Sequence, residues 1–193
     1  MPEKTLKLMA EDVRKLNTEK GWREPGKTYG DYIALLHTEV GEMSDAFRRW
    51  GLEDGTDHNA VNADEGGLPK PEGIGAELAD VLIRTLDTLD VVTMKWMDTG
   101  LGPNDRLTEL PVWSMSLIIQ KGLAPGPLVS FCDYASFLHR VIDRLWDNLG
   151  AFEDVLRAVV TVARRFDIDL LAEYDRKMEH NWQRSYRHGG KLI

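Results

Sequence analysis

The amino-acid sequence predicts an all-α protein with a single domain. Apolar residues recur at spacings of three and four along most of the chain, and no segment has a convincing strand pattern. Glycine or proline separates several of the periodic segments. The chain has 193 residues, of which 42% are hydrophobic, so it can form a sizeable core. We therefore expect one all-α domain over residues 1–193.

Three helices are predicted in the N-terminal half. Residues 5–20 and 31–50 each carry an apolar stripe at helical spacing, and a glycine directly follows each segment. The segment 52–75 is rich in acidic residues and glycine, so we interpret it as a surface loop. The stripe resumes over residues 76–98, which we predict to be the third helix.

The C-terminal half adds three or four helices. A short helix is predicted over residues 112–121, before a connector rich in glycine and proline. Two amphipathic helices follow over residues 128–149 and 152–166, with a glycine between them. The last helix extends from about Asp169, which is a suitable N-cap residue, to about Arg184.

The composition argues against several classes of protein. The chain carries 24 Lys+Arg against 32 Asp+Glu, a net charge of −8, which disfavours non-specific binding to nucleic acid. No apolar run approaches the roughly 18 residues of a membrane span, and the first residues lack the apolar core of a signal peptide. A single cysteine, Cys132, excludes an intrachain disulfide. We expect a cytoplasmic protein with no nucleic-acid or membrane partner.

Two predicted helices carry acidic residues three positions apart. These are Glu39 and Glu42 in the second helix, and Glu77 and Asp80 in the third. Each acid directly precedes an apolar stripe residue, so the four carboxylates can face one another when the helices pack by their stripes. Such acids must bind protons, pair with bases or hold a metal ion, and oxygen ligands favour Mg²⁺ or Mn²⁺ over zinc. Two solvated helix faces are the alternative.

The C-terminal helix carries a polar motif of a different kind. Lys177, Asn181 and Arg184 lie at positions i, i+4 and i+7, and therefore on one helix face. Cations and an amide beside an acidic metal site suit a polyphosphate, because the metal and the cations together neutralise its oxygens. The alternative is a solvated helix end, where basic residues also suit the helix dipole.

Three motifs in this order resemble the MazG-like nucleotide pyrophosphohydrolases of the all-α NTP pyrophosphatase superfamily. They are Glu39-x-x-Glu42, then Glu77-Leu-Ala-Asp80-Val-Leu, then Lys177-x-x-x-Asn181-x-x-Arg184-x-Tyr186-x-His-Gly. The resemblance covers roughly residues 5–90 and 166–191, and it is nearest to phage and actinobacterial MazG-like proteins. For a phage protein, the expected location is the cytoplasm of the host.

The resemblance implies Mg²⁺-dependent hydrolysis of NTP or dNTP between the α- and β-phosphates, with Mn²⁺ as a possible replacement. Glu39, Glu42, Glu77 and Asp80 would hold the metal, and Glu39 or Glu42 would activate the attacking water. The resemblance also implies that residues near the C-terminus bind the substrate: Lys177, Asn181, Arg184, Tyr186 and Arg187. For the base we expect contacts with Trp22, His37 and Trp50, and the alternative for these three is ordinary packing. Asp45 is a candidate for supporting Glu42.

The sequence departs from the family pattern by an insert of approximately residues 91–165. Within it, residues 133–150 resemble residues 31–51, with Asp-Tyr and Leu-His at the same places. An internal duplication and a chance likeness of two amphipathic helices both explain this. Val141 and Arg144 stand where Glu39 and Glu42 would align, so we expect one carboxylate site per chain.

Assembly and two other functions stay open at this point. Short members of the family resemble dimers or tetramers, so we expect a homodimer, in which the insert either replaces part of the partner or caps the pocket. A second possibility for the function is hydrolysis of a related compound, such as phosphoribosyl-ATP, an alarmone or a modified nucleotide. A third is a non-catalytic helical module that binds a nucleotide or a protein.

Overall fold

The computed structural model describes six stretches of the chain: residues 4–23, 26–52, 58–63, 69–97, 128–148 and 150–189. These stretches are predominantly helical, with six α-helices and one two-stranded sheet. The all-α prediction is thereby confirmed at the level of fold class.

The six α-helices of the described residues follow the predicted order, with one short 3₁₀-helix after α4 and another after α6. The α-helices are α1 (Leu6–Glu19), α2 (Tyr29–Trp50), α3 (Ile74–Met97), α4 (Phe131–Asp143), α5 (Ala151–Arg165) and α6 (Leu170–Gln183). The 3₁₀-helices are η3 (Arg144–Trp146) and η4 (Tyr186–Gly189). The predicted short helix over 112–121 lies outside the described residues.

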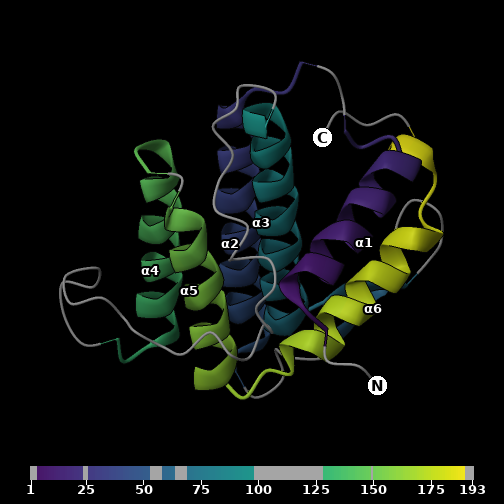
Figure 1. The fold of residues 1–193 in the computed structure, drawn as a ribbon. Coiled ribbons are helices and arrows are strands. Elements are labelled where there is room, and N and C mark those ends of the chain that lie inside the picture. Colours follow the sequence, from purple (N-terminus) through teal and green to yellow (C-terminus); the bar gives the residue numbers. More distant parts are fainter. Residues whose placement is uncertain are drawn as a thin grey trace.

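Helices α2 and α3 pack against each other at the centre of the molecule (Figure 1). The α4–α5 hairpin lies on one side of this pair, where α4 contacts α2 and α5 contacts α3. On the other side, α1 and α6 both contact α3. Two layers of helices therefore enclose the central pair, and the polar residues of α2 and α3 lie between neighbouring helices.

The α2 helix begins and packs as its sequence dictates. The Thr28 side chain accepts a hydrogen bond from the Asp31 backbone, and the Asp31 side chain accepts one from the Thr28 backbone, which is a capping box. The apolar stripe through Leu36, Val40 and Met43 is fully buried. Burial of this stripe, at about 25 cal/mol per Å² of apolar surface, is the main force that fixes the helix against its neighbours.

The segment between α2 and α3 differs from the prediction. It contains an antiparallel pair of strands, β1 (His58–Ala63) and β2 (Pro69–Glu72), where we expected only a loop. The prolines of β2 have no N–H to donate, and neither strand shows alternating hydrophobicity, so the usual strand signals are missing. Gly73, with a φ of 112°, then turns the chain into α3.

The predicted helix over residues 128–149 also ends differently. Helix α4 stops at Asp143 and continues as the 3₁₀-helix η3. At the start of α6 the prediction is confirmed. Asp169 is the N-cap residue of this helix, and its side chain accepts a hydrogen bond from the Ala172 N–H.

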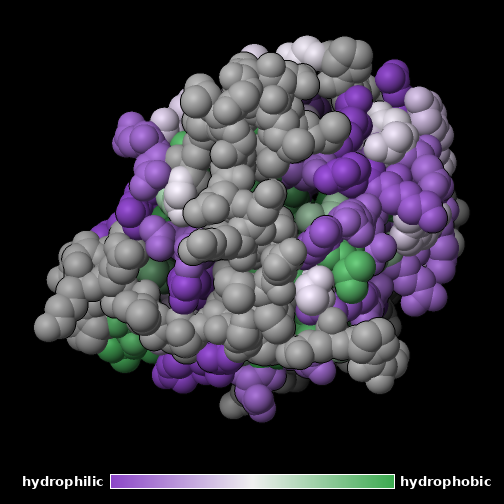
Figure 2. All heavy atoms as spheres, viewed as in Figure 1, coloured by the Kyte–Doolittle hydropathy of each residue, from purple (hydrophilic) through white to green (hydrophobic). Residues whose placement is uncertain are grey.

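The visible surface around α1 and α6 is mostly hydrophilic (Figure 2). Hydrophobic residues show there only in small, separate areas. Among the described residues, no helix combines the length and the apolar character needed to cross a membrane.

Candidate functional site

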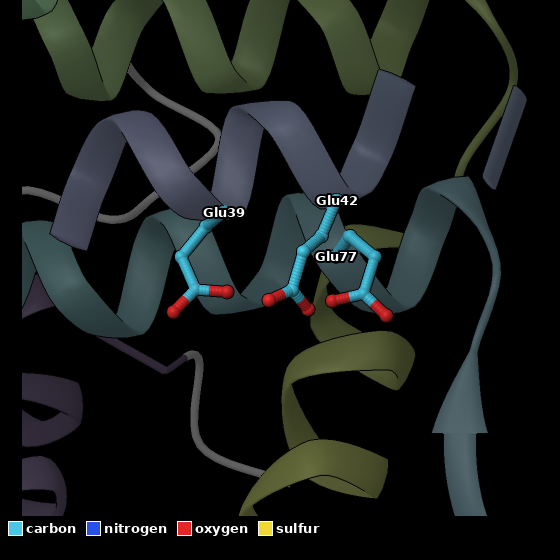
Figure 3. Close-up of side chains that lie close together, drawn as sticks. All are labelled: Glu39, Glu42 and Glu77. Carbon is cyan, nitrogen blue, oxygen red and sulfur yellow. The ribbon is translucent and has the colours of Figure 1, made fainter. Parts of the chain in front are cut away.

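Three glutamates from the central helices converge on one point. Glu39 and Glu42 come from α2 and Glu77 comes from the first turn of α3, and one carboxylate oxygen of each lies within 4.8 Å of the others. Figure 3 shows the three carboxylates on the same side of the α2–α3 pair. Glu39 and Glu77 are buried, whereas Glu42 is exposed. The prediction that these acids face one another across the α2–α3 seam is confirmed for the three glutamates.

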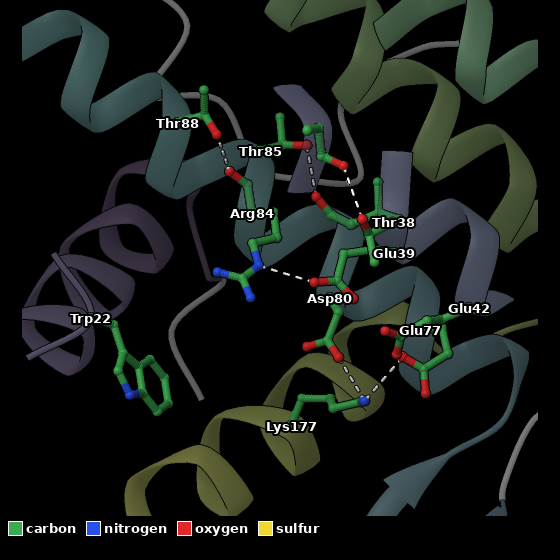
Figure 4. A network of polar contacts seen from close by, with 12 residues as sticks. Trp22, Thr38, Glu39, Glu42, Glu77, Asp80, Arg84, Thr85, Thr88 and Lys177 are labelled. Atoms are coloured by element: carbon green, nitrogen blue, oxygen red, sulfur yellow. Dashed lines mark hydrogen bonds and ion pairs between the residues drawn. The ribbon is translucent and has the colours of Figure 1, made fainter. Parts of the chain in front are cut away.

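Asp80 lies beside this group and pairs with a lysine. The Lys177 Nζ donates to the Asp80 Oδ2 at 2.6 Å and to the Glu77 Oε2 at 3.4 Å (Figure 4). The Lys177 side chain is only 2% exposed. Helix α6 therefore brings the first residue of the tail motif directly to the acids of α3.

Two further cations approach the acids of α2. The Arg84 Nε donates to the Glu39 Oε1 at 3.0 Å, and Lys70 Nζ lies 3.9 Å from the Glu42 Oε2. Each carboxylate of the cluster thus has a cationic neighbour. This arrangement compensates the mutual repulsion of the acids in the absence of a metal ion.

The environment of Glu39 favours its neutral form. The pKa of Glu39 is raised from 4.5 to about 6, mainly by burial and next by the nearby Asp80 carboxylate, while Arg84 opposes the shift. The protonation state of Glu39 therefore changes close to neutral pH.

Glu77 shows a larger shift in the same direction. The pKa of Glu77 is raised from 4.5 to about 8, because burial and the Asp80 carboxylate together outweigh the opposing effect of Lys177. For Lys177, burial disfavours the charge, but Asp80 and Glu77 outweigh it and raise the pKa of the lysine. Lys177 is therefore a protonated cation enclosed by carboxylates.

A small cavity adjoins the acidic cluster. It has a volume of about 140 Å³, and both Glu42 and Glu77 line it. Its other walls come from the end of α2 and from β2: Asp45, Ala46, Arg49, Trp50, Lys70 and Glu72. Asp45 lies in the cavity wall together with Glu42, and its carboxylate pairs with Arg49 at 2.6 Å. The predicted contact residue Trp50 lies in this wall.

The other tail residues extend from Lys177 toward the end of α1. Asn181 is buried one turn after Lys177, and the Arg184 guanidinium lies 6.0 Å from the centre of the Trp22 ring. Tyr186 is 62% exposed and covers Gly21, and the Arg187 guanidinium lies 5.6 Å from the Tyr186 ring. These residues stand at the junction of α6 with α1.

The two remaining candidate base contacts lie in different places. Trp22 is buried, and its ring points into the space beside Arg84 and Lys177 (Figure 4). His37, in contrast, contacts α4, where its Nδ1 lies 2.8 Å from the His139 Nδ1 and its Nε2 lies 3.1 Å from Asp143. The structure thus places His37 against the insert and apart from the carboxylates.

Sequence reasoning missed Arg84 and Lys70. Arg84 follows Asp80 by one helical turn, so the spacing argument that selected Glu77 and Asp80 could have found it. Lys70 gave no such signal, because it lies in a segment without periodicity. It is a residue of β2, and the position of that strand brings it near Glu42.

The fold and the cluster define a helical protein with a largely buried, acidic and charge-compensated site. Comparison with protein-family models, with curated proteins and with solved structures finds no match for this chain.

Proposed function

We propose that the protein is a Mg²⁺-dependent nucleoside triphosphate pyrophosphohydrolase of the MazG-like kind. The reaction is hydrolysis of an NTP or dNTP between its α- and β-phosphates, which gives a monophosphate and pyrophosphate. The observation that carries the proposal is the convergence of Glu39, Glu42 and Glu77 within 4.8 Å. The motif resemblance described above supports it.

The donor set suits a hard divalent cation. Glu39, Glu42 and Glu77 offer only carboxylate oxygens, which are the ligands that Mg²⁺ and Mn²⁺ prefer, and Asp80 is within reach of the same region. A cation bound there would polarise phosphate oxygens and lower the pKa of a water molecule. The raised pKa values of Glu39 and Glu77 fit this role, because buried acids that resist ionisation are stabilised by a bound cation.

The chain's own cations suit the polyphosphate. Lys177, Arg84 and Lys70 lie beside the carboxylates and can donate hydrogen bonds to phosphate oxygens. Arg184, at the end of α6, and Trp22, just after α1, lie close together, where a sugar or base could bind. The cavity beside Trp50 is a second candidate for the base. Nucleotide-pool control is the setting that we propose for such an activity.

Phosphorus NMR of a panel of NTPs and dNTPs with the protein and Mg²⁺ tests the proposal. We expect monophosphate and pyrophosphate, with no reaction after EDTA is added. Diphosphate and orthophosphate would reject cleavage between the α- and β-phosphates. If no standard nucleotide reacts, phosphoribosyl-ATP, an alarmone and modified nucleotides are tested next, and binding without turnover of any of them would contradict an enzymatic role.

A further inference from the structure

We infer that the α4–α5 hairpin is an internal copy of the α2–α3 hairpin that has lost its carboxylate site. It takes the place that a second chain would occupy on α2–α3, so one chain forms the complete helical unit with one acidic site. The inference goes beyond the proposed function and does not depend on it. Four independent observations support it.

The first observation is that α2 and α4 begin with the same motif. Thr28 and Asp31 form a capping box at the start of α2, and Ser130 and Asp133 form one at the start of α4. The two boxes have the same separation in the chain, 102 residues, as His37 and His139. The local structure of both helix starts therefore agrees with one common alignment.

The second observation is that equivalent residues meet. In this alignment His37 corresponds to His139, and their Nδ1 atoms lie 2.8 Å apart with the rings stacked at a centroid distance of 5.1 Å. When two copies are related by a two-fold axis, a residue contacts its own equivalent only where the axis passes. The histidine pair marks such an axis between α2 and α4.

The third observation is that the ends of α2 and α4 pack reciprocally. The Tyr29 ring at the start of α2 lies 5.9 Å from Trp146, just after α4. The Phe131 ring at the start of α4 lies 4.4 Å from Phe47, near the end of α2. Phe131 corresponds to Tyr29 in the alignment, so each copy places its first aromatic residue on the far end of the other. Trp146 and Phe47 are not equivalent positions in the alignment, but the contacts of helix start with helix end run in both directions, as they do at an isologous interface.

The fourth observation is that α5 matches α3. Asp154, Val155 and Leu156 align with Asp80, Val81 and Leu82 at a separation of 74 residues, which is smaller than 102 because the connection between α4 and α5 is shorter than that between α2 and α3. Both apolar pairs are buried. The helix contacts correspond as well, because α4 packs on α5 as α2 packs on α3, and α5 also contacts α3. The whole hairpin, and not only one helix, therefore repeats.

The copy has lost the acids that form the cluster. Val141 replaces Glu39 and is fully buried, Arg144 replaces Glu42, and Ala151 replaces Glu77. The one retained acid, Asp154, pairs with the Arg144 Nη1 at 2.6 Å. An ion pair thus occupies the place of the carboxylate cluster, and the described residues of the α4–α5 hairpin contain no second group of acids that converge as the three glutamates do.

The occupant of the α2–α3 face is therefore the chain's own hairpin. A homodimer, which the family resemblance led us to expect, would need the same face if it were built around the same axis. In that case His37 would meet the partner's own copy of this residue. The two arrangements differ in what lies next to His37.

Cross-linking at His37 separates these arrangements. In a Cys132→Ser background, which removes the exposed free thiol, we compare His37→Cys alone with His37→Cys/His139→Cys, using a short bismaleimide. We expect the double variant to be linked within one chain and the single variant to form no linked dimer. Circular dichroism and the melting temperature verify that each variant folds.

A mixture of unlabelled and isotope-labelled protein identifies the linked chains by mass spectrometry. Linked peptides that never combine the two labels would support the internal copy. A linked dimer of the single variant would overturn the inference, as would mixed-label peptides from the double variant, or a folded double variant that does not cross-link. None of these readouts requires a metal or a nucleotide, so failure of the proposed function leaves this test intact.

Discussion

The charge balance around single residues dominates the acidic cluster. Two opposite charges about 4 Å apart interact far more strongly in a partly buried site than in bulk water. Lys177 contributes one such charge at 2.6 Å from Asp80, and Arg84 contributes another at 3.0 Å from Glu39. Under the proposed function, a metal ion or a substrate would therefore have to exchange with cations that are already in place. This exchange makes individual substitutions informative.

Replacement of Glu42 by Gln should abolish turnover while the fold persists. The Glu42 side chain is 47% exposed, and its only described ion pair, with Lys70, is long at 3.9 Å, so its charge contributes little to stability. As a proposed metal ligand, however, its loss should reduce the rate at least about 10²-fold, as for other electrostatic groups at reaction centres. The rate of pyrophosphate release and the melting temperature measure the two effects.

Glu11→Gln is the matched control, because Glu11 is an exposed carboxylate on α1 away from the cluster. It should leave both the rate and the melting temperature unchanged. Equal activity of Glu42→Gln and Glu11→Gln would show that Glu42 holds no metal ion needed for the reaction.

Replacement of Lys177 by Met should destabilise the metal-free protein strongly. Removing one partner of a buried ion pair leaves uncompensated charge, which costs roughly 3–5 kcal/mol. Here Glu77 and Asp80 would lose the cation that lies between them. The loss should be smaller at low pH, where the acids are protonated. Urea unfolding at two pH values measures it.

The double variant Lys177→Met/Asp80→Asn provides the comparison, because it removes a charge from each partner. It should be more stable than Lys177→Met alone. If the two variants unfold at the same urea concentration, Lys177 does not act as the counter-ion of Asp80.

At the scale of elements, hydrogen bonds to the end of α1 hold the end of helix α6 and the basic residues Arg184 and Arg187 that follow it. The Lys20 Nζ donates to the carbonyl oxygens of Trp182 at 2.5 Å and Arg184 at 2.7 Å, and the Arg187 N–H donates to the Lys20 carbonyl at 2.9 Å. A cation at a helix C-terminus satisfies carbonyls that lack intrahelical partners. The end of α1 therefore fixes the end of α6.

Replacement of Lys20 by Met should release this end and weaken nucleotide binding more than it weakens the fold. We expect a decrease in stability of about 1 kcal/mol, typical for a lost cap or charged hydrogen bond. The KM for the nucleotide should rise because Arg184 loses its fixed position, while kcat changes less. Lys7→Met, at an exposed site of α1, is the control and should alter neither quantity. A decrease of kcat in Lys20→Met with an unchanged KM would contradict a positioning role.

The helices and the three glutamates were predictable because both depend on local spacing. An apolar stripe fixes which face of α2 is buried, and Glu39 and Glu42 follow from it. Lys70 was not predictable, because its position depends on a strand pair without a sequence signal. The position of His37 was not predictable either. The sequence suggested a contact with the base, but the packing of α4 on α2 decides its neighbour, which is His139.

The whole molecule couples its stability to protons through the buried cluster. The folded state holds protons on Glu39 up to about pH 6 and on Glu77 up to about pH 8, whereas both groups ionise near pH 4.5 in the unfolded chain. Between these values the folded state binds more protons than the unfolded state. Stability therefore decreases as the pH rises through this window.

The melting temperature of the metal-free protein should accordingly decrease between pH 5 and pH 8, by roughly 2–4 °C for each kcal/mol lost. If the site holds Mg²⁺ as proposed, the ion should restore the melting temperature, and more at pH 8 than at pH 6, because it would bind the ionised carboxylates of the folded state. Glu77→Gln removes the group with the highest raised pKa of the cluster acids, so its curve should flatten above about pH 6. Subtracting that curve from the wild-type curve cancels the contribution of the His37–His139 pair, where burial and the neighbouring histidine lower the pKa of His139 and thus give the opposite slope. A difference curve that is flat up to pH 8, or a Mg²⁺ effect that is equal at both pH values, would mean that Glu77 is not the buried acid that links metal binding to folding.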